Sequence, residues 1–255
     1  MTVGDYLHGT RRRFRRDPTP TAVRETIAEF ARGLRRRRDR LAFRVLGDRT
    51  IDTELAGVRA TFHAENDVDA ERARSLNREQ AVAEWLLADC DDGTVLWDVG
   101  AHHGHYAVLA ALQGATVVAF EPDAGNRERI ARNAVLNGVS PTVRPEALSD
   151  TDGEAAFGGE SENELAVGAG DRTVETRRGD GIDPAPTVVK LDVEGHELAA
   201  LDGMAARLGV VDRIAVEVHD GVPPGAVRAR LDDAGLELVE LGSARSQTYL
   251  GGIRP

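Results

Sequence analysis

The sequence predicts an α/β fold with a mostly parallel sheet, and three observations support this prediction. From about residue 78 onward, short apolar runs alternate with stretches of helical periodicity, as they do in parallel sheets. The first run ends in a glycine loop, Gly100 to Gly104, that opens a helix. The second run ends in Glu121, about 20 residues after the loop begins. Ligands of such sheets bind beyond the carboxyl ends of the strands.

Length and composition fit one large globular domain with a small appendage. The 255 residues are 41% hydrophobic, and the single cysteine, Cys90, excludes an intrachain disulfide framework and a cysteine-rich zinc module. No apolar run approaches the roughly 18 to 20 residues that a membrane-spanning helix needs. Residues 10–16, TRRRFRR, resemble a twin-arginine export signal, but the apolar stretch that should follow is missing. We therefore expect a cytoplasmic protein.

Strands and helices of the main domain are expected to alternate along the chain. Asn77, with Gln80 as its capping partner, is expected to begin a helix with an apolar face. A helix that stops at Gly114 follows the glycine loop, and another runs from a cap at Asp123 to Gly138. The last two strands are expected to form an antiparallel hairpin through a Gly-Ser turn. The expected strands are Thr94–Val99, Thr116–Phe120, Thr142–Arg144, Thr187–Val193, Arg213–Val218, Leu236–Leu241 and Gln247–Ile253.

The N-terminal part of the chain has a different character. Two arginine-rich helical segments precede expected short strands at Leu41–Leu46 and Gly57–His63, so residues 1–76 are predicted to form an appended helical and β extension. Residues 77–255 then make up the main domain. Asp150–Gly181, which is rich in glycine and acidic residues, is predicted to be an extended, partly exposed insertion with one or two short strands.

Charge is distributed unevenly along the chain. Residues 1–40 hold 12 arginines and five acidic residues, a net charge of +7, which leaves −18 on the rest. Lys190 is the only lysine, and such an acidic surface resembles that of proteins from salt-loving archaea, although coding bias also exchanges lysine for arginine. The acidic body argues against a nucleic-acid substrate. The basic arm either packs on this body or binds an anionic lipid surface.

The glycine loop and the acidic residue after the next strand indicate an adenosine-containing cofactor. Backbone N–H groups at the helix start after Gly104 attract an anion, and Glu121 can accept hydrogen bonds from both hydroxyls of a ribose. A dinucleotide site needs a middle glycine, which the spacing of Gly100 and Gly104 lacks. Asp98 would repel a pyrophosphate but suits the ammonium group of an amino acid. These residues favour S-adenosylmethionine over NAD, with an NAD-dependent oxidoreductase as the alternative.

Several motifs within about residues 78 to 222 together resemble one family. DVGAHHGHY, FEPD, NAVLNG, PEALSDTDGEAAF, VVKLDVEGHELAALDGM and IAVEVH are similar to the FkbM family of S-adenosylmethionine-dependent methyltransferases. The resemblance implies a Rossmann-like class I methyltransferase fold, in which helices cover both faces of a mostly parallel seven-stranded sheet that ends in an antiparallel strand. It also implies O-methylation, often of sugar or polyketide hydroxyls. His102 and His103 depart from the family, which more often has asparagine and a hydrophobic residue there. Asp98, Gly100, Gly104 and Glu121 fall on the cofactor positions of the family. The full set of expected cofactor-binding residues is Asp98, Gly100, Ala101, His102, Gly104, Tyr106, Glu121, Pro122, Glu146, Ala147 and Asp192.

A second group of charged residues alternates with apolar ones near the end of an expected strand. In VVKLDVE, this alternation places Lys190, Asp192 and Glu194 on one face. Burying three charges is costly unless they pair or take part in a site, and Glu217 and His219 end the next strand. These residues therefore line a site, or Lys190 forms a structural ion pair with Asp192 or Glu217.

The predicted reaction is methyl transfer to an oxygen of a glycan or of its lipid-linked precursor, either a sugar hydroxyl or a uronic-acid carboxylate. A hydroxyl needs a general base, for which His219 and Asp192 are the candidates with Glu194 as an orienting group; a carboxylate needs none. The other alternative is a cofactor-binding scaffold that has lost catalysis. The sequence predicts no oligomeric state.

The clustering of histidines in the sequence also suggests a metal site, but we expect that the protein requires no metal. His102, His103 and His105 lie on a turn, where consecutive side chains diverge, and no helical pair of histidines exists. A metal at the carboxylates would be magnesium or manganese rather than zinc.

Overall fold

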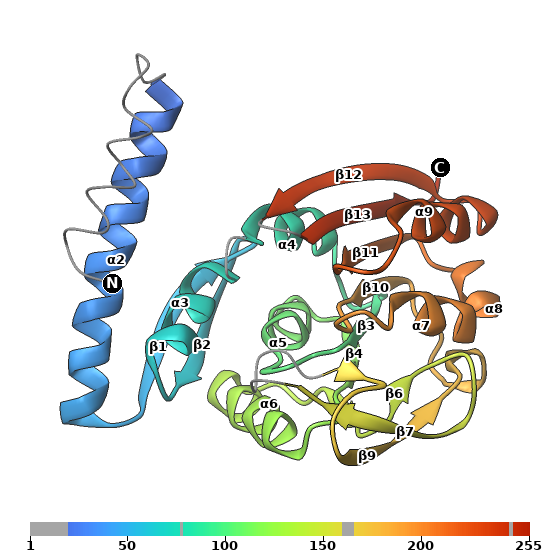
Figure 1. Cartoon of the computed structure of the whole chain (residues 1–255), viewed down its shortest axis with the longest axis horizontal. Helices are drawn as coiled ribbons and strands as arrows, with labels where there is room; N and C mark the ends of the chain where they lie inside the picture. The colour runs from blue at the N-terminus through green and yellow to red at the C-terminus, as the bar shows by residue number, and fades with distance from the viewer. Residues whose placement is uncertain (1–19, 77–78, 160–165, 245–246) are drawn as a thin grey trace. The chain divides into compact units, whose positions relative to one another are not determined.

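A computed structural model describes residues 20–76, 79–159, 166–244 and 247–255 (Figure 1). The chain divides into two compact units. Among the described residues, the smaller unit holds 20–49 and Ala64–Glu71, and the larger holds Thr50–His63 and the residues from Arg72 onward. The expected domain boundary after residue 76 stays a prediction. Within the described residues, no helix is both long and apolar enough to cross a membrane.

Helix α2, Pro20–Leu46, is the main element of the smaller unit. The strand predicted at Leu41–Leu46 is wrong, because these residues form the last turns of this helix. No glycine or proline interrupts the chain between Gly33 and Gly47, and the intervening arginines favour helix. Gly47, with a φ of 71°, ends the helix. The first predicted arginine-rich segment, around Arg11–Arg16, lies outside the described residues.

Helix α3, Asp67–Ser75, begins within the smaller unit with a cap at Asn66. The side-chain oxygen of Asn66 accepts hydrogen bonds from the backbone N–H groups of Val68 and Asp69, both at 2.9 Å. These bonds satisfy two of the donors that a helix start leaves open.

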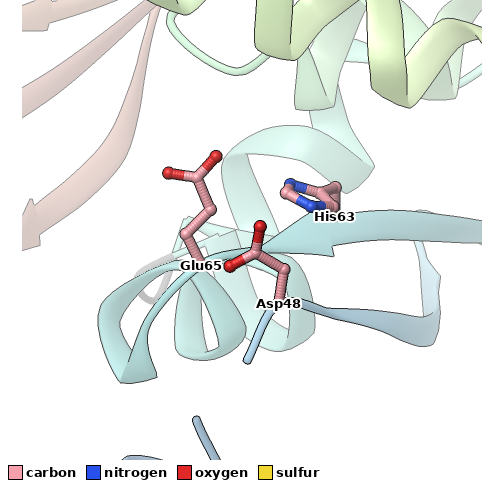
Figure 2. Close-up of side chains that lie close together, drawn as sticks. All are labelled: Asp48, His63 and Glu65. Atoms are coloured by element: carbon pink, nitrogen blue, oxygen red, sulfur yellow. The ribbon is translucent and has the colours of Figure 1, made fainter. Parts of the chain in front are cut away.

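Ion pairs connect α2 to the start of α3. Arg36 and Arg40 lie 3.4 and 3.1 Å from the carboxylate of Asp67. Two acidic residues of the same unit, Asp48 and Glu65, hold carboxylate oxygens within 4.8 Å of each other (Figure 2). Such an acidic pair by itself indicates no ligand.

Strands β1, Arg49–Leu55, and β2, Val58–Ala64, form a two-stranded sheet. Strand β2 confirms the prediction at Gly57–His63, whereas β1 was not predicted. In the larger unit, α6 (Ala124–Asn137) supplies two side-chain amides to the edge of β2. The oxygens of Asn133 and Asn137 accept the backbone N–H groups of His63 and Thr61, each at 2.8 Å.

A seven-stranded sheet forms the centre of the larger unit, as predicted, in the order β12-β13-β11-β10-β3-β4-β5. Strand β13 runs antiparallel to its neighbours, and the five strands from β11 to β5 are parallel. From β3 the chain proceeds toward β5 and later returns to β10 on the other side of β3, so the direction of winding reverses between these two strands. The strands are β3 (Val95–Val99), β4 (Thr116–Phe120), β5 (Thr142–Arg144), β10 (Val188–Leu191), β11 (Arg213–Val218), β12 (Glu237–Ala244) and β13 (Gln247–Ile253).

The C-terminal hairpin differs from the prediction at its turn. Strand β12 continues through the predicted Gly-Ser turn to Ala244, with a register shift against β13 between Glu240 and Gly242. Gly242 has a φ of 117°, a backbone conformation that residues with a side chain rarely adopt. The glycine therefore allows a β-bulge inside the strand.

Helices lie on both sides of the sheet, with α5 (His105–Leu112) and α6 on one side and α7 (Glu197–Gly203) and α9 (Pro224–Asp233) on the other (Figure 1). The described residues of this unit also form helices α4 (Gln80–Leu86) and α8 (Ala205–Leu208). The predicted capping residue Asn77 lies outside the described residues, and Glu79 occupies the N-cap position of α4 but makes no side-chain hydrogen bond that caps the helix.

The segment Asp150–Gly181 is more regular than predicted, since its described residues, which leave out 160–165, form three strands instead of one or two. Its β7 (Gly153–Gly158) pairs antiparallel with β9 (Arg172–Arg177) and with β8 (Ala166–Val167), and β6 (Ala147–Leu148) pairs with β9. Glycine-rich, acidic strands carry little apolar periodicity, so their pairing is not visible in the sequence. A short 3-10 helix, η2 (Gly179–Gly181), ends the segment.

Candidate active site

The loop after β3 is held tightly against two neighbouring strands. The N–H groups of Gly100 and Ala101 donate to the carbonyl oxygen of Phe120 at the end of β4, at 3.0 and 3.1 Å. A Cβ at Gly100, whose φ is 78°, would lie 1.8 Å from the backbone oxygen of Asp192. Gly100 is therefore required where the loops after β3 and β10 meet, at the point where the winding reverses.

Asp98 lies beneath this loop with one oxygen available. Its Oδ2 accepts the N–H of Ala107 at 3.0 Å, whereas its buried Oδ1 has no hydrogen-bond partner within the described residues. Burial raises the pKa of Asp98 to about 6, against the opposing charge of Lys190 on the adjacent strand. A buried carboxylate with an unused oxygen suits a cationic group such as an ammonium.

Glu121 connects the loops after β3 and β4. Its Oε2 accepts the N–H of His102 at 2.7 Å, and its Oε1 accepts the N–H of Asp123 at 2.9 Å. Burial raises the pKa of Glu121 to about 7, although both hydrogen bonds oppose the shift. Each carboxylate oxygen has two lone pairs, so Glu121 can still accept further hydroxyl donors.

A cleft of about 670 Å³, open to solvent, lies over these loops. Of the predicted cofactor residues, it is lined by Gly100, His102, Glu121, Pro122, Ala147 and Asp192. The other predicted residues, which lie outside its lining, are Asp98, Ala101, Gly104, Tyr106 and Glu146. Lining residues that were not predicted as cofactor-binding are Arg72, Val99, Phe120, Asn126, Leu148, Phe157, Val167, Val193, Glu194 and His196.

Two of the predicted cofactor residues make supporting contacts instead of lining the cleft. The hydroxyl of Tyr106 donates to Glu79 at 3.3 Å, and its ring centre lies 5.3 Å from Nζ of Lys190. Glu146 accepts a hydrogen bond from Arg144 at 2.7 Å, and its other oxygen is buried without a partner within the described residues.

Three histidines pack together on the loop after β3, residues 100–104, and at the start of α5; we call this loop the cofactor loop. The rings of His102 and His103 stack with centroids 3.8 Å apart. Nδ1 of His102 lies 2.6 Å from a guanidinium nitrogen of Arg72, so it acts as an acceptor. Burial lowers the pKa of His103 to about 2 and that of His105 to about 3, and it also lowers the pKa of His102. All three rings are therefore neutral at physiological pH.

Lys190 is the only one of the three alternating charges that lies within a strand, since β10 ends at Leu191. The expected placement of all three on one strand face is wrong in this respect, because Glu194 belongs to a tight turn with a φ of 47°. Lys190 forms the ion pair that was considered, 2.8 Å from Asp192 Oδ2, and donates to the carbonyl of Gly100 at 3.3 Å.

His219, which follows β11, lies within a group of carboxyl side chains. Its Nδ1 lies 2.6 Å from Oε1 of Glu197, which is fully buried. Its Nε2 lies 3.2 Å from Glu194, 3.6 Å from Asp192 and 3.8 Å from Glu217. Burial opposes a charge on the ring, but the bond to Glu197 and the nearby carboxylates outweigh it and raise the pKa of His219 to about 9. The structure therefore brings together the residues predicted as catalytic, Asp192, Glu194 and His219.

Sequence reasoning missed Arg72 and Glu197. Arg72 lies outside the recognised motifs and reaches the cofactor loop from α3. Glu197 is part of the quoted KLDVEGHE block, where a second glutamate after the glycine was the available signal.

Fold and site together define an α/β protein with a candidate site for an adenosyl cofactor at the reversal point of its sheet. Gly100 allows close backbone approach, the free oxygen of Asp98 suits an ammonium, and Glu121 suits a ribose diol. These residues fit S-adenosylmethionine.

Comparison with known proteins identifies the family. A family profile described as the methyltransferase FkbM domain matches residues 98–238. The hexuronic acid methyltransferase AglP of Haloferax volcanii is 35% identical over 214 residues, which cover 79% of this chain and 87% of that protein. The chain belongs to the FkbM methyltransferase family. It is an S-adenosylmethionine-dependent methyltransferase, and the oxidoreductase alternative is not supported.

Solved methyltransferase structures are also similar to this chain. Magnesium protoporphyrin IX methyltransferase of Synechocystis with bound SAM is 17% identical, with a TM-score of 0.47 and coverage of 70% of this chain and 79% of that one. The 16S rRNA N2 G1207 methyltransferase of T. thermophilus is 17% identical, with a TM-score of 0.49 and coverage of 82% and 51%.

Proposed function

We propose that this enzyme methylates the carboxylate of a hexuronic acid within a glycan and so produces a methyl ester. The observation that carries this proposal is the 35% identity to a hexuronic acid methyltransferase over 87% of that protein. A uronate offers both a carboxylate and several hydroxyls as methyl acceptors. The relative therefore supports the class of sugar, and the choice between these oxygens has to be argued from their reactivity.

Reactivity favours the carboxylate oxygen. Sugar carboxylic acids are ionised at neutral pH, whereas hydroxyls lose a proton only with the help of a positioned base. When bound, S-adenosylmethionine supplies a methyl group activated by a positively charged sulfur. The carboxylate oxygen forms the new bond to the methyl carbon, the carbon–sulfur bond breaks, and its electron pair goes to the sulfur. No proton has to move, so the protein needs mainly to orient the acceptor.

The cleft lining, together with the buried Asp98 outside it, offers groups for both substrates. Asp98 would bind the ammonium of the cofactor and Glu121 its ribose, while Pro122 and Ala147 would contact the adenine. Arg72 lines the same cleft and supplies a positive charge for an anionic acceptor. With a hydroxyl acceptor, His219 or Asp192 would have to serve as the base.

Cellular context follows from the substrates. The use of S-adenosylmethionine, which cells make internally, supports a cytoplasmic location. A glycan on a lipid carrier would present the acceptor at a membrane surface, where the seven arginines between residues 32 and 44 could contact anionic head groups.

A pair of matched acceptors tests the proposal. The enzyme and S-adenosylmethionine are incubated with an aryl glucuronide or with the corresponding aryl glucoside, and the masses of the products are measured by mass spectrometry. We expect the glucuronide alone to gain one CH2 and to lose it again in mild alkali, which cleaves esters but not ethers. An alkali-stable product, or equal methylation of the glucoside, would show that a hydroxyl is the acceptor.

A further inference from the structure

Methyl transfer to a carboxylate leaves the group around His219 without a role. Its Nε2 lies 3.2 Å from Oε2 of Glu194 and 3.6 Å from Oδ1 of Asp192. One ligand atom from each of the three residues falls within 4.8 Å of the others. Two ligand atoms bound to one cation at about 2.1 Å lie about 3 Å apart when they occupy adjacent positions. The spacing is close to that of three ligands sharing one metal ion.

His219 distinguishes this group from an ordinary acidic cluster. The side chain is only 8% exposed, and Nε2 has no hydrogen-bond partner within the described residues although it faces the carboxylates. Its other ring nitrogen is held at 2.6 Å by the fully buried Glu197. Metal-binding histidines usually donate their second N–H to a carboxylate in this way, which directs the lone pair of the other nitrogen at the metal.

Surrounding charges favour a cation at this position. Lys190 pairs with Oδ2 of Asp192, which leaves Oδ1 facing the imidazole. A further carboxyl oxygen, Oε1 of Glu217, lies 3.8 Å from Nε2 and also accepts the hydroxyl of Tyr249 at 3.2 Å. The carboxylates of Asp192 and Glu194, which both lie near Nε2 of His219, would attract a cation to this position.

We propose that Asp192, Glu194 and His219 bind a divalent cation and that Glu197 is a positioning residue for His219. Two carboxylates and one imidazole suit an ion that takes mixed oxygen and nitrogen ligands, such as Mn²⁺. The ion takes the place of a proton on the imidazole. Resting on the proposed function, the inference adds that open positions on the cation bind the carboxylate of the uronate acceptor.

Direct binding of Mn²⁺ to the full chain tests the site independently of activity. The protein is treated with a chelator and then titrated with Mn²⁺ while electron paramagnetic resonance measures the free ion, in molar potassium chloride that screens weak surface binding. We expect one tightly bound ion per chain. If the wild-type protein binds no Mn²⁺ tightly under these conditions, the proposal is overturned.

Variants assign the ligands. Glu194→Gln and His219→Gln should weaken Mn²⁺ binding by at least about tenfold, and Glu197→Gln by about tenfold to a hundredfold. Asp202→Asn, which changes an exposed carboxylate of α7 that pairs with Arg230 of α9, is the matched control and should bind like the wild type. If the other three variants bind Mn²⁺ as tightly as the control Asp202→Asn does, the assignment of the ligands is overturned. Thermal melts in chelator check that Glu197→Gln is folded, so that its effect is separated from a general loss of structure.

The aryl glucuronide separates this inference from the proposed function. We expect removal of the cation to raise the KM for the glucuronide while leaving the affinity for S-adenosylhomocysteine unchanged. Ester formation with an unchanged KM in chelator overturns the role in acceptor binding and leaves the proposed function intact. Tight Mn²⁺ binding by a protein that methylates no uronate supports the site and overturns the proposed function.

Discussion

Glu121 connects two loops of the fold and is also the residue that we propose as the ribose ligand of the cofactor. It holds the N–H groups of His102 and Asp123, and its pKa is raised to about 7 by burial. A ribose diol that donates hydrogen bonds to this carboxylate stabilises its ionised form. Cofactor binding should therefore release a proton wherever Glu121 is protonated in the free enzyme.

This linkage predicts a pH-dependent affinity. Affinity for S-adenosylhomocysteine should rise between about pH 6.5 and 8 as Glu121 ionises, because the ligand favours the deprotonated form. Glu121→Ala should weaken binding by roughly 1.5 to 3 kcal/mol, the range for hydrogen bonds to a charged group, and should flatten the pH dependence. Isothermal titration calorimetry measures both quantities.

The matched control for Glu121 is Glu128→Ala, an exposed carboxylate on α6 that does not line the cleft. This variant should keep both the affinity and the pH dependence of the wild type. If Glu121→Ala binds the cofactor as tightly as Glu128→Ala does, Glu121 is not a ribose ligand.

Residue types at strand ends could be predicted because local pattern determines them. Asp98, Glu121 and Asp192 follow apolar runs directly, so the sequence alone places them at one edge of the sheet. Glu197 and Arg72 could not be found in this way. Glu197 acts on a residue 22 positions away and Arg72 on one 30 positions away, through contacts that only the packed fold creates.

At the scale of elements, the loop after β3 depends on the absence of a side chain at Gly100. Gly100→Ala would place a Cβ 1.8 Å from the oxygen of Asp192, a backbone atom that cannot move without shifting the end of β10. The φ of 78° adds strain of about 1 to 3 kcal/mol. We expect a melting temperature several degrees lower and a cofactor affinity reduced by at least about tenfold.

Gly225→Ala is the control for this substitution. Gly225 lies in the first turn of α9, where an added Cβ meets no atom within 4 Å, so its melting temperature should be unchanged or slightly higher. Calorimetry and thermal melts compare the two variants. Wild-type affinity in Gly100→Ala would mean that the contact between the two loops is not needed for binding.

Elements with strong periodicity were predicted accurately, and those without it were not. Strands β4 and β11 have their predicted bounds, because apolar β-branched runs between turn residues favour buried strands. Leu41–Leu46 is an apolar run of similar length, yet it continues a helix because no breaking residue precedes it. Strand β1 alternates acidic residues with threonine and isoleucine, and it becomes a strand through pairing with β2.

At the scale of the whole molecule, net charge is the property that follows most directly from the sequence. The net charge of −11 combines a basic N-terminal segment with an acidic remainder of −18. Exposed ion pairs such as Arg230 with Asp202 contribute at most about 1 kcal/mol each, so they offset little of the repulsion among the remaining carboxylates. Similarity to a protein of Haloferax volcanii fits an adaptation to salt.

Repulsion of this kind predicts that salt stabilises the fold. The melting temperature should rise from about 0.1 M to 2 M potassium chloride, most steeply below about 0.5 M, because the Debye length falls from about 10 Å to about 3 Å by 1 M. Molar salt also strengthens the burial of apolar surface, but that effect grows steadily with concentration and does not depend on net charge. Repeating the series near the isoelectric point of about 5.2 separates the two, since the early rise should shrink there while the gradual one persists. A melting temperature that is equal or lower in 2 M salt at neutral pH would mean that self-repulsion does not limit the stability of this enzyme.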